Sequence, residues 1–387
     1  MAGLYIHIPF CQSRCIYCDF YSTTLPASWQ MPYIEAIGRE LELRIDSAND
    51  KGPSQLWGKD VGIESLYIGG GTPSLLTGEA LRRLFSTVCQ HITLAPHAEV
   101  TIEANPDDVS PEWISLLKDT PVNRVSMGVQ SLDDKILRTL RRRHTALQAR
   151  HAVDLLQEAG YTNLSIDLIY GLPGQSLTQF ESDVRNVLAM GIPHLSAYAL
   201  QFEDGTPLMK MKEKGEISEA DEELSLACYN RLIDLTAEAG LEHYEISNFA
   251  KPGWRSRHNS SYWTGMPYMG LGAGAHSYDG RRLRSYNCED IKTYMQELGQ
   301  NRLPMEIEEL DDDALYNERV MLSLRTCEGL SLENLERDFG NERTTYCLRM
   351  AKSHLDNGRL QEKAGKTLCL TRNGLFVSDD IISDLMV

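Results

Sequence analysis

Short runs of strand-forming residues recur along the first half of the chain, separated by segments with helical periodicity. The runs lie at residues 4–8, 65–68, 99–103, 124–129, 164–169 and 195–200. Helical patterns between them include residues 33–45, 78–91, 111–117 and 147–159. This alternation predicts parallel strands joined by crossover helices, an α/β fold with a partial (β/α)6 TIM-like barrel. In such a barrel the active site lies at the C-terminal ends of the strands.

The regular alternation fades beyond about residue 205. One long amphipathic helix is expected over residues 213–240, and a stretch rich in Gly, aromatic and polar residues follows over 243–276. An acidic run at 306–313 marks a boundary, and a hairpin over 360–370 is typical of a small α+β winged-helix-like domain. We therefore expect a barrel domain, a connecting region and a winged-helix-like C-terminal domain, over residues 1–235, 236–305 and 306–387.

The charge and hydropathy of the chain narrow the classes of partner. Among 387 residues, 38 Lys and Arg oppose 55 Asp and Glu, which gives a net charge of −17. Such a chain repels phosphate backbones and anionic lipid, so we expect no nucleic acid and at most peripheral membrane contact. The sequence shows neither a membrane-spanning apolar run nor a secretory signal. Its nine cysteines, an odd number, do not suit a disulfide framework, so the cytoplasm is the expected location.

Three cysteines stand close together directly after the first predicted strand. Cys11, Cys15 and Cys18 form a C-x3-C-x2-C pattern on the loop at the C-terminal end of that strand. Structural zinc usually has four protein ligands, and no nearby His or Cys obviously completes the set. A [4Fe-4S] cluster normally takes four cysteines, so three would leave one iron open to a small chelating molecule. A zinc knuckle and incidental loop cysteines are the alternatives.

Glycines and polar residues follow other predicted strands at the same edge of the sheet. The segment GGGTP at 69–73 follows the second strand, and its glycines let a ligand approach the backbone. Glu103 ends the third strand and Gln130 ends the fourth. Asp167 lies in the otherwise apolar fifth strand, where a carboxylate is costly unless it binds something. Arg142 has other arginines around it, so a helix-surface charge and a nucleic-acid patch are alternative interpretations.

The cysteine spacing, directly after an N-terminal strand of a partial barrel, resembles the radical S-adenosylmethionine (SAM) superfamily. In that superfamily the amino and carboxylate groups of SAM chelate the open iron, and an electron from the cluster splits the sulfonium bond. The chain is similar over nearly its whole length to the oxygen-independent coproporphyrinogen III oxidase family, through the segments LYIHIPFC, GGGTP, GVQ and DLIYGLPGQ. The resemblance implies a cluster on the three cysteines and a SAM site formed by Tyr5, Tyr17, Gly70, Gly71, Thr72, Glu103, Gln130, Arg142, Asp167 and Ala199.

Two features separate the chain from the oxidase within that family. In the oxidase, one residue follows the third cysteine and then a fourth cysteine comes, whereas here Asp19 and Phe20 follow Cys18. The oxidase also carries an N-terminal extension that is implicated in substrate handling, whereas Cys11 lies close to the start of this sequence. Both features argue against oxidative decarboxylation of coproporphyrinogen.

A third feature is the segment HNSSYW, which begins at His258. It is similar to the H-N-x-x-Y-W motif that marks the family's haem chaperone subgroup. The resemblance implies haem binding by His258, Asn259, Tyr262 and Trp263, with His258 as an axial imidazole ligand and Asn259 orienting it. The aromatic rings would offer flat apolar faces to the macrocycle. His276 is a second candidate ligand, and a hydrogen-bonded loop histidine with aromatic packing between domains is the alternative.

Three functions of different classes follow from these patterns. The first is a haem chaperone with a [4Fe-4S] cluster and exchangeable SAM, which receives electrons from a donor and delivers haem to acceptor haem proteins such as respiratory enzymes. The second is an oxygen-independent coproporphyrinogen III dehydrogenase, or another radical SAM enzyme acting on a tetrapyrrole. The third is a non-redox metal or nucleic-acid protein. We favour the first, and whether the chain is also an enzyme stays open.

Overall fold

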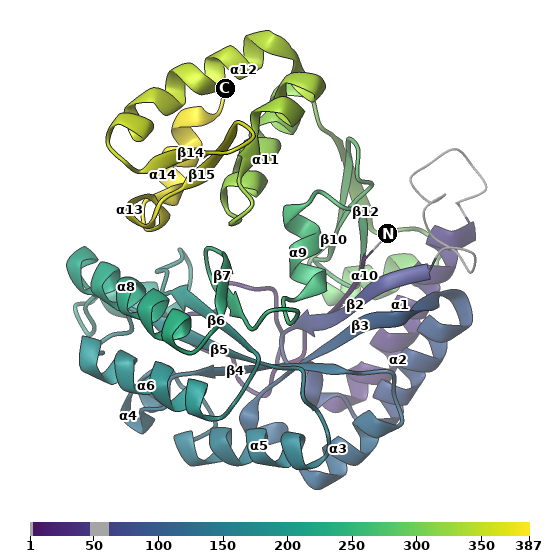
Figure 1. Ribbon diagram of the computed structural model, residues 1–387. Helices are drawn as coiled ribbons and strands as arrows, with labels where there is room; N and C mark the ends of the chain where they lie inside the picture. Colours follow the sequence, from purple (N-terminus) through teal and green to yellow (C-terminus); the bar gives the residue numbers. More distant parts are fainter. Residues whose placement is uncertain (1–2, 47–61) are drawn as a thin grey trace.

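The computed structural model describes residues 3–46 and 62–387. Its main body is a twelve-stranded sheet, and the six predicted strands form the parallel centre of that sheet in sequence order (Figure 1). The prediction of a partial barrel of parallel strands is thereby confirmed. These strands are β1 (Gly3–Ile8), β2 (Gly62–Gly70), β3 (Thr93–Ala104), β4 (Arg124–Gln130), β5 (Leu164–Tyr170) and β6 (His194–Ala199).

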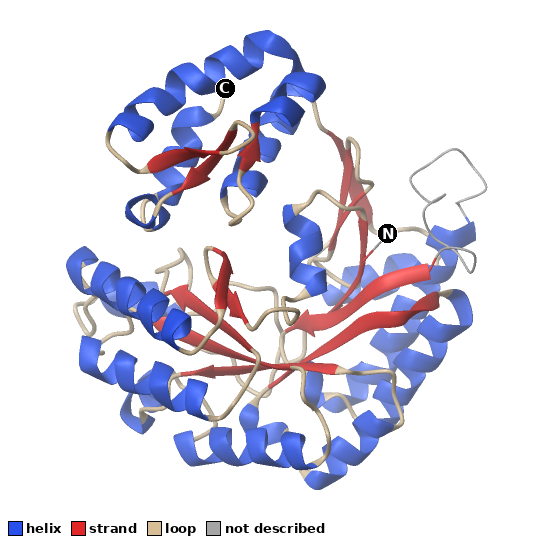
Figure 2. Ribbon diagram, viewed as in Figure 1, coloured by secondary structure: helices blue, strands red, loops and turns tan. Residues whose placement is uncertain are grey.

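Helices cover the outer face of the parallel strands (Figure 2). They are α1 (Gln30–Asp46), α2 (Gly78–His91), α3 (Pro111–Lys118), α4 (Asp134–Thr139), α5 (Ala146–Glu158) and α6 (Leu177–Ala189). Local sequence sets where two of them begin, because capping boxes pair Thr145 with Gln148 at α5 and Ser176 with Gln179 at α6. β1 and β5 are buried along nearly their whole length, as expected for central strands of a parallel sheet.

Further strands extend the sheet at both edges, and the sequence did not predict them. At one edge β9 (Tyr268–Leu271) pairs parallel with β1, and an antiparallel series continues beyond it. At the other edge β8 pairs antiparallel with β6, and β7 pairs with β8. The remaining elements of these edges are β7 (Glu242–Glu245), β8 (Asn248–Ala250), β10 (His276–Tyr278), β11 (Leu283–Asn287), β12 (Met305–Glu309) and α10 (Ile291–Gly299).

The long helix predicted over residues 213–240 is wrong in its first third. The chain forms α7 (Pro207–Glu213), leaves the helix at Gly215 with φ at 70°, and begins α8 (Glu222–Glu238) only after Asp221. A glycine with positive φ ends a helix readily, and the Asp221 side chain accepts the Leu224 N–H to begin the next one. The predicted range therefore covers the end of α7, the turn that follows it and the whole of α8.

The C-terminal residues form a second body with its own hydrophobic core, drawn in yellow-green at the top of Figure 1. The predicted hairpin is confirmed, with its turn at Gly365 and Lys366, both at positive φ. None of the described helices is long and apolar enough to cross a membrane. The elements of this body are α11 (Asp312–Leu324), β13 (Leu330–Ser331), α12 (Leu332–Asp356), β14 (Leu360–Lys363), β15 (Thr367–Leu370), α13 (Arg372–Leu375) and α14 (Ser378–Leu385).

Candidate cluster and cofactor site

The loop that follows β1 brings the three cysteines to one cavity. Backbone hydrogen bonds close the base of this loop, because Cys11 N donates to Thr23 O at 2.8 Å and Thr23 N donates to Pro9 O at 2.7 Å. Between these points the chain is free to turn outward, and Cys11, Cys15 and Cys18 all line the same cavity. The cavity opens at the C-terminal ends of the parallel strands, where this architecture places active sites.

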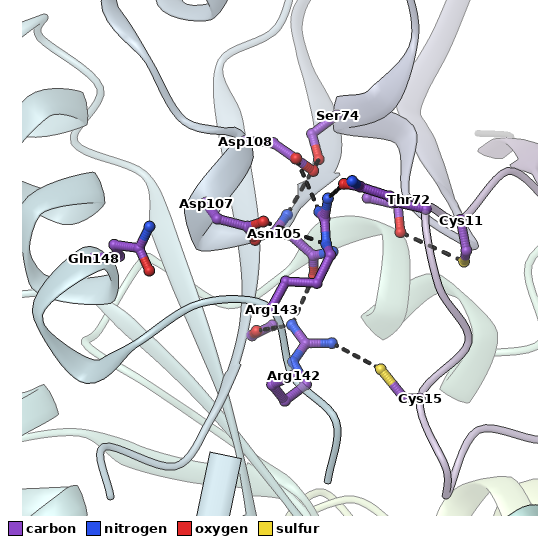
Figure 3. Close-up of polar contacts among 12 residues, drawn as sticks. Cys11, Cys15, Thr72, Ser74, Asn105, Asp107, Asp108, Arg142, Arg143 and Gln148 are labelled. Atoms are coloured by element: carbon purple, nitrogen blue, oxygen red, sulfur yellow. Dashed lines mark hydrogen bonds and ion pairs between the residues drawn. The ribbon is translucent and has the colours of Figure 1, made fainter. Parts of the chain in front are cut away.

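Side chains donate hydrogen bonds to two of the three thiols, and the backbone at Phe20 donates to the third, Cys18. The Thr72 hydroxyl donates to Cys11 Sγ at 3.5 Å, and the Arg142 guanidinium donates to Cys15 Sγ at 3.2 Å (Figure 3). Burial raises the pKa of the Cys11 thiol and raises that of Cys18 to about 11. Bound iron would instead lower the pKa of these thiols, because a coordinating thiol loses its proton.

The donor set fits an iron–sulfur centre. Among residues 3–46 and 62–387, no three His, Cys, Asp or Glu side chains gather as ligands of a single metal ion, so the thiols surround the cavity instead of meeting at one point. Three thiolates suffice for a [4Fe-4S] cluster with one open iron. In the part of the chain that the structure describes, the buried Arg142 Nε has no hydrogen-bond partner, and this cation beside the thiols suits a negatively charged centre.

Hydrogen bonds to three parts of the chain hold Arg142: the cysteine loop, the residue after β3, and β4. Its Nη2 donates to Asn105 Oδ1 at 2.6 Å and to the Gly128 carbonyl at 2.5 Å, while Nη1 reaches Cys15. The predicted SAM residue Arg142 is therefore also a direct contact of a predicted cluster ligand. This position could not be deduced from the sequence, where Arg142 is one of several neighbouring arginines.

Arg143 also points into the protein. It forms ion pairs with Asp108 at 2.9 Å and with Asp107 at 3.3 Å, both in the short helix η5 (Pro106–Asp108) (Figure 3). Arg142 and Arg143 are thus engaged by internal acceptors, whereas Arg138 and Arg141 are exposed. The geometry of the first two does not support the interpretation as a nucleic-acid patch.

A buried carboxylate stands on the opposite wall of the cavity. Glu103 accepts a hydrogen bond from Tyr67 OH at 2.8 Å and from Gly70 N at 3.0 Å. A side chain at Gly69 would displace this carboxylate, because a Cβ would lie 2.9 Å from Glu103 Oε1. Burial raises the pKa of Glu103 to about 7, and burial raises that of Asp167 to about 6. Both carboxyl groups therefore change charge close to neutral pH.

The cavity has a volume of about 480 Å³. Most of the residues predicted to hold SAM line it, namely Tyr17, Gly71, Thr72, Glu103, Gln130, Arg142, Asp167 and Ala199. The other two lie behind the wall. Gly70 supplies its N–H to Glu103, and the Tyr5 hydroxyl lies 3.0 Å from His7 Nδ1.

Several lining residues were missed by the sequence analysis: Tyr67, Asn105, Ser126, Ser196 and Tyr198. Strand alternation could have found some of them, because Ser126 and Gly128 share one face of β4, and Ser196 and Tyr198 share one face of β6. Tyr67 reaches the cavity through its contact with Glu103, which no sequence pattern shows.

The HNSSYW segment forms most of α9 (Arg257–Trp263), and a carboxylate of β3 anchors the start of this helix. Glu99 accepts hydrogen bonds from the backbone N–H groups of Arg257 and His258, each at 3.0 Å. The Ser256 hydroxyl accepts the N–H of Asn259 at 3.3 Å. A carboxylate at a helix N-terminus satisfies free donors and complements the helix dipole, so α9 is held firmly on the sheet.

His258 lies inside the protein, with both ring nitrogens engaged. Its side chain is 1% exposed, Nδ1 lies 2.9 Å from Ser65 Oγ, and Nε2 lies 2.8 Å from Tyr262 OH. The imidazole also stacks on Tyr67, with ring centroids 5.1 Å apart. Burial, with the nearby charge of Arg124, lowers the pKa of His258 to about 3. Axial ligation of iron would require a nitrogen to leave Ser65 or Tyr262.

The four residues predicted to bind haem do not share one cavity. Asn259 lines the cluster cavity, whereas Trp263, at the other end of α9, lines a second hollow between the sheet and the C-terminal body. Tyr262 packs its ring edge-on against Tyr268. His276 is exposed on β10 beside Tyr286, away from both. α9 therefore joins two separate cavities.

Comparison with known proteins gives a family for this site and fold. Residues 5–187 match the Radical SAM superfamily, and residues 310–377 match the HemN C-terminal domain. The structure of coproporphyrinogen III oxidase (HemN) from Escherichia coli, a radical SAM enzyme, covers 100% of the chain and 90% of its own, with a TM-score of 0.84. Its sequence is 21% identical, so this likeness concerns the fold.

Curated relatives are more similar in sequence. The haem chaperone HemW of Mycobacterium tuberculosis is 36% identical, covering 99% of this chain and 94% of its own length. HemW of Lactococcus lactis is 35% identical over 87% of this chain and 84% of its own length, and HemW of Bacillus subtilis is 31% identical over 98% of both. The chain therefore belongs to the HemW family of the radical SAM superfamily.

Proposed function

We propose that the chain is a haem chaperone, which binds haem and passes it to acceptor haem proteins such as respiratory enzymes. The observation that carries this proposal is the similarity to proteins named haem chaperone HemW over the barrel and the C-terminal body alike. The residues after Cys18, Asp19 and Phe20, support it, because they replace the additional cysteine of the oxidase. All nine cysteines are free thiols, which suits the reducing cytoplasm.

We propose Cys11, Cys15 and Cys18 as the ligands of a [4Fe-4S] cluster, and the radical SAM domain supports both this cluster and SAM. The cluster would supply an open iron for the amino and carboxylate groups of SAM and would pass on an electron from an external donor. Arg142 and Thr72 donate hydrogen bonds to the sulfurs of Cys15 and Cys11. For Cys11 the Thr72 hydrogen bond lowers the pKa of the thiol and so opposes the effect of burial, which raises it.

The wall opposite the cysteines would hold SAM. Gly71 lines the cavity, Gly70 donates its N–H to Glu103 from behind the wall, and Glu103 would accept a hydrogen bond from an amino or ribose hydroxyl group of SAM. Tyr5 stays behind this wall and supports it. The proposed SAM site comprises Tyr5, Tyr17, Gly70, Gly71, Thr72, Glu103, Gln130, Arg142, Asp167 and Ala199.

For haem, we propose that residues at both ends of α9 contribute to binding. Asn259 and Trp263 present side chains to the two cavities at its ends. His258 holds the helix against the sheet through the contact between Nδ1 and the Ser65 hydroxyl, and Tyr262 engages Nε2 of the same ring within the helix. An imidazole released from these contacts would be needed for an axial role of His258.

A second candidate is a radical SAM enzyme that acts on coproporphyrinogen III or another tetrapyrrole. Two observations favour it: eight of the ten predicted SAM residues line one cavity with the cysteines, and the carboxyl groups of Glu103 and Asp167 titrate near neutrality. A group poised near the working pH suits proton transfer. This enzyme would form product only with cluster, SAM and reductant together.

One experiment separates the two functions. The cluster is reconstituted anaerobically, haem is titrated into the protein, and the Soret band is recorded, while a parallel sample receives coproporphyrinogen III, SAM and reductant. The proposal predicts a saturable Soret change at equal amounts of haem and protein, with no protoporphyrinogen formed. Decarboxylated product without specific haem binding would overturn it.

A further inference from the structure

A cleft lies between the sheet and the C-terminal body, and the cluster and SAM site do not use it. Its volume is about 930 Å³, and it shares no lining residue with the cluster cavity. One side is formed by α9 and the β10–β11 hairpin, the other by α11 and the first part of α12. A cleft of this size is in the range that holds a large organic ligand.

Aromatic rings from four elements line the cleft. They are Tyr244 in β7, Trp263 at the end of α9, Tyr278 at the end of β10, and Phe339 beside the bend of α12 at Gly340. Within residues 3–46 and 62–387, the indole Nε1 of Trp263 is buried and has no hydrogen-bond partner. A buried indole N–H usually finds an acceptor, so this wall of the cleft holds an unsatisfied donor.

Arginine is abundant around the same cleft. Five arginines and four acidic residues line it, an excess of positive charge in a chain whose net charge is −17. Arg319 pairs with Asp338 at 2.9 Å, and Arg255 pairs with Glu328 at 2.7 Å. Within residues 3–46 and 62–387, Arg281 makes no ion pair, and it is exposed at the hairpin turn. A free guanidinium fork is suited to a carboxylate.

The lining also lacks the usual ligands of haem iron. No described residue that lines the cleft is a His, Cys or Met. A flat ligand could therefore contact the rings and the arginines of the cleft, while its centre would gain no imidazole, thiolate or thioether from these walls.

We propose that this cleft binds a planar tetrapyrrole dicarboxylate, held by its ring faces and its carboxylates and not through a metal at its centre. In the proposed function, on which this inference rests, that ligand is haem. Iron without a ligand from the cleft would stay open to a side chain of the acceptor protein. In this arrangement the contacts of His258 hold α9 in the position that places Trp263 at the cleft.

The test uses the full chain with two probes, haem and iron-free protoporphyrin IX. Each is titrated separately into the wild type and into Arg281→Glu, Trp263→Phe and Arg83→Glu. Arg83 is an exposed arginine of α2 that lies outside both cavities, so it is matched to Arg281 in charge change. We expect protoporphyrin to bind, and Arg281→Glu to weaken both ligands about tenfold, as for a lost hydrogen-bonded charge. Trp263→Phe should weaken both by a smaller factor, and Arg83→Glu should change neither.

The outcomes separate this inference from the proposed function. If the wild type binds haem but not protoporphyrin, or if both cleft variants bind haem as the wild type does, the cleft proposal is overturned while the haem chaperone stands. If protoporphyrin binds in a manner that depends on Arg281 but haem does not bind, the cleft proposal stands and the chaperone function fails. If neither probe binds the wild type, both fail.

Discussion

The imidazole Nδ1 of His258 lies 2.9 Å from the Ser65 hydroxyl, inside the protein, and not at the surface of a cavity. Nε2 is engaged by Tyr262, and the ring stacks on Tyr67, which in turn donates a hydrogen bond to Glu103. The histidine of the HNSSYW segment thus connects α9 with β2 and, through Tyr67, with the wall of the SAM cavity. It acts here as a positioning residue.

Replacing Ser65 distinguishes this role from iron ligation. Ser65→Ala leaves Nδ1 of His258 buried without a partner and should lower the free energy of unfolding by about 1–3 kcal/mol. His258→Ala removes the ring and should cost about 2–4 kcal/mol. Urea unfolding measures both. We expect the folded fraction of each variant to show an unshifted Soret maximum with haem, whereas a shift confined to His258→Ala would identify the imidazole as an iron ligand.

Removing one cysteine of the loop should abolish the cluster. Cys15→Ala loses the sulfur that Arg142 contacts, and a cluster bound by two remaining thiolates is not retained. Iron and sulfide analysis after reconstitution should fall from about four irons per chain to almost none. Cys89→Ala, at an exposed thiol of α2, is the matched control and should keep the wild-type iron content. Equal iron contents in the two variants would exclude Cys15 as a ligand.

Gly71 should not tolerate a side chain. A Cβ at this position would lie 2.7 Å from the carbonyl carbon and oxygen of Pro9, so the backbone that leads into the cysteine loop would have to move. We expect Gly71→Ala to destabilise the fold by about 1–3 kcal/mol and to lower cluster incorporation. Gly299→Ala adds a methyl group where nothing lies within 4 Å and should be neutral or stabilising. Thermal unfolding and iron content check both variants, and wild-type values for Gly71→Ala would refute the close approach.

The affinity for SAM should rise with pH because of Glu103. Its pKa of about 7 lies above the ordinary value of 4.5 because the carboxyl group is buried. The ionised fraction therefore increases about tenfold from pH 6 to pH 8, and an ionised carboxylate is the better acceptor. Isothermal titration with SAM on the cluster-loaded protein should show this increase, and Glu103→Gln should flatten it. An unchanged slope in Glu103→Gln would assign the pH dependence to another group.

The same ionisation opposes folding when SAM is absent. A folded pKa above the unfolded one means that the contribution of Glu103 to stability is complete below pH 4.5 and is lost as the pH rises through about 7. SAM would offset this loss by giving the carboxylate a partner.

Hydrophobic periodicity and apolar runs predicted the elements whose formation depends mainly on neighbouring residues. The helix α2 begins and ends where periodicity and the Thr77 cap place it, and the six central strands follow from their apolar runs. The cysteines and most of the predicted SAM residues meet because parallel strands end at one edge of the sheet.

The features that the sequence analysis missed depend on contacts between residues that are far apart in the chain. β9 to β12 are short and partly exposed, and they extend the sheet from the edge at which β9 pairs with β1. The positions of Arg142 against Cys15 and of His258 against Ser65 join residues far apart in the chain, which no local pattern encodes. The cleft beside Trp263 likewise depends on how the C-terminal body packs.

The most direct test of the chaperone function follows haem from this protein to an acceptor. Haem-loaded protein is mixed with an apo acceptor haem protein in the presence of excess apomyoglobin, which traps any haem released into solution. The account predicts that the acceptor gains its own haem spectrum while apomyoglobin stays largely empty. Haem found only on apomyoglobin, with the acceptor still empty, would contradict it.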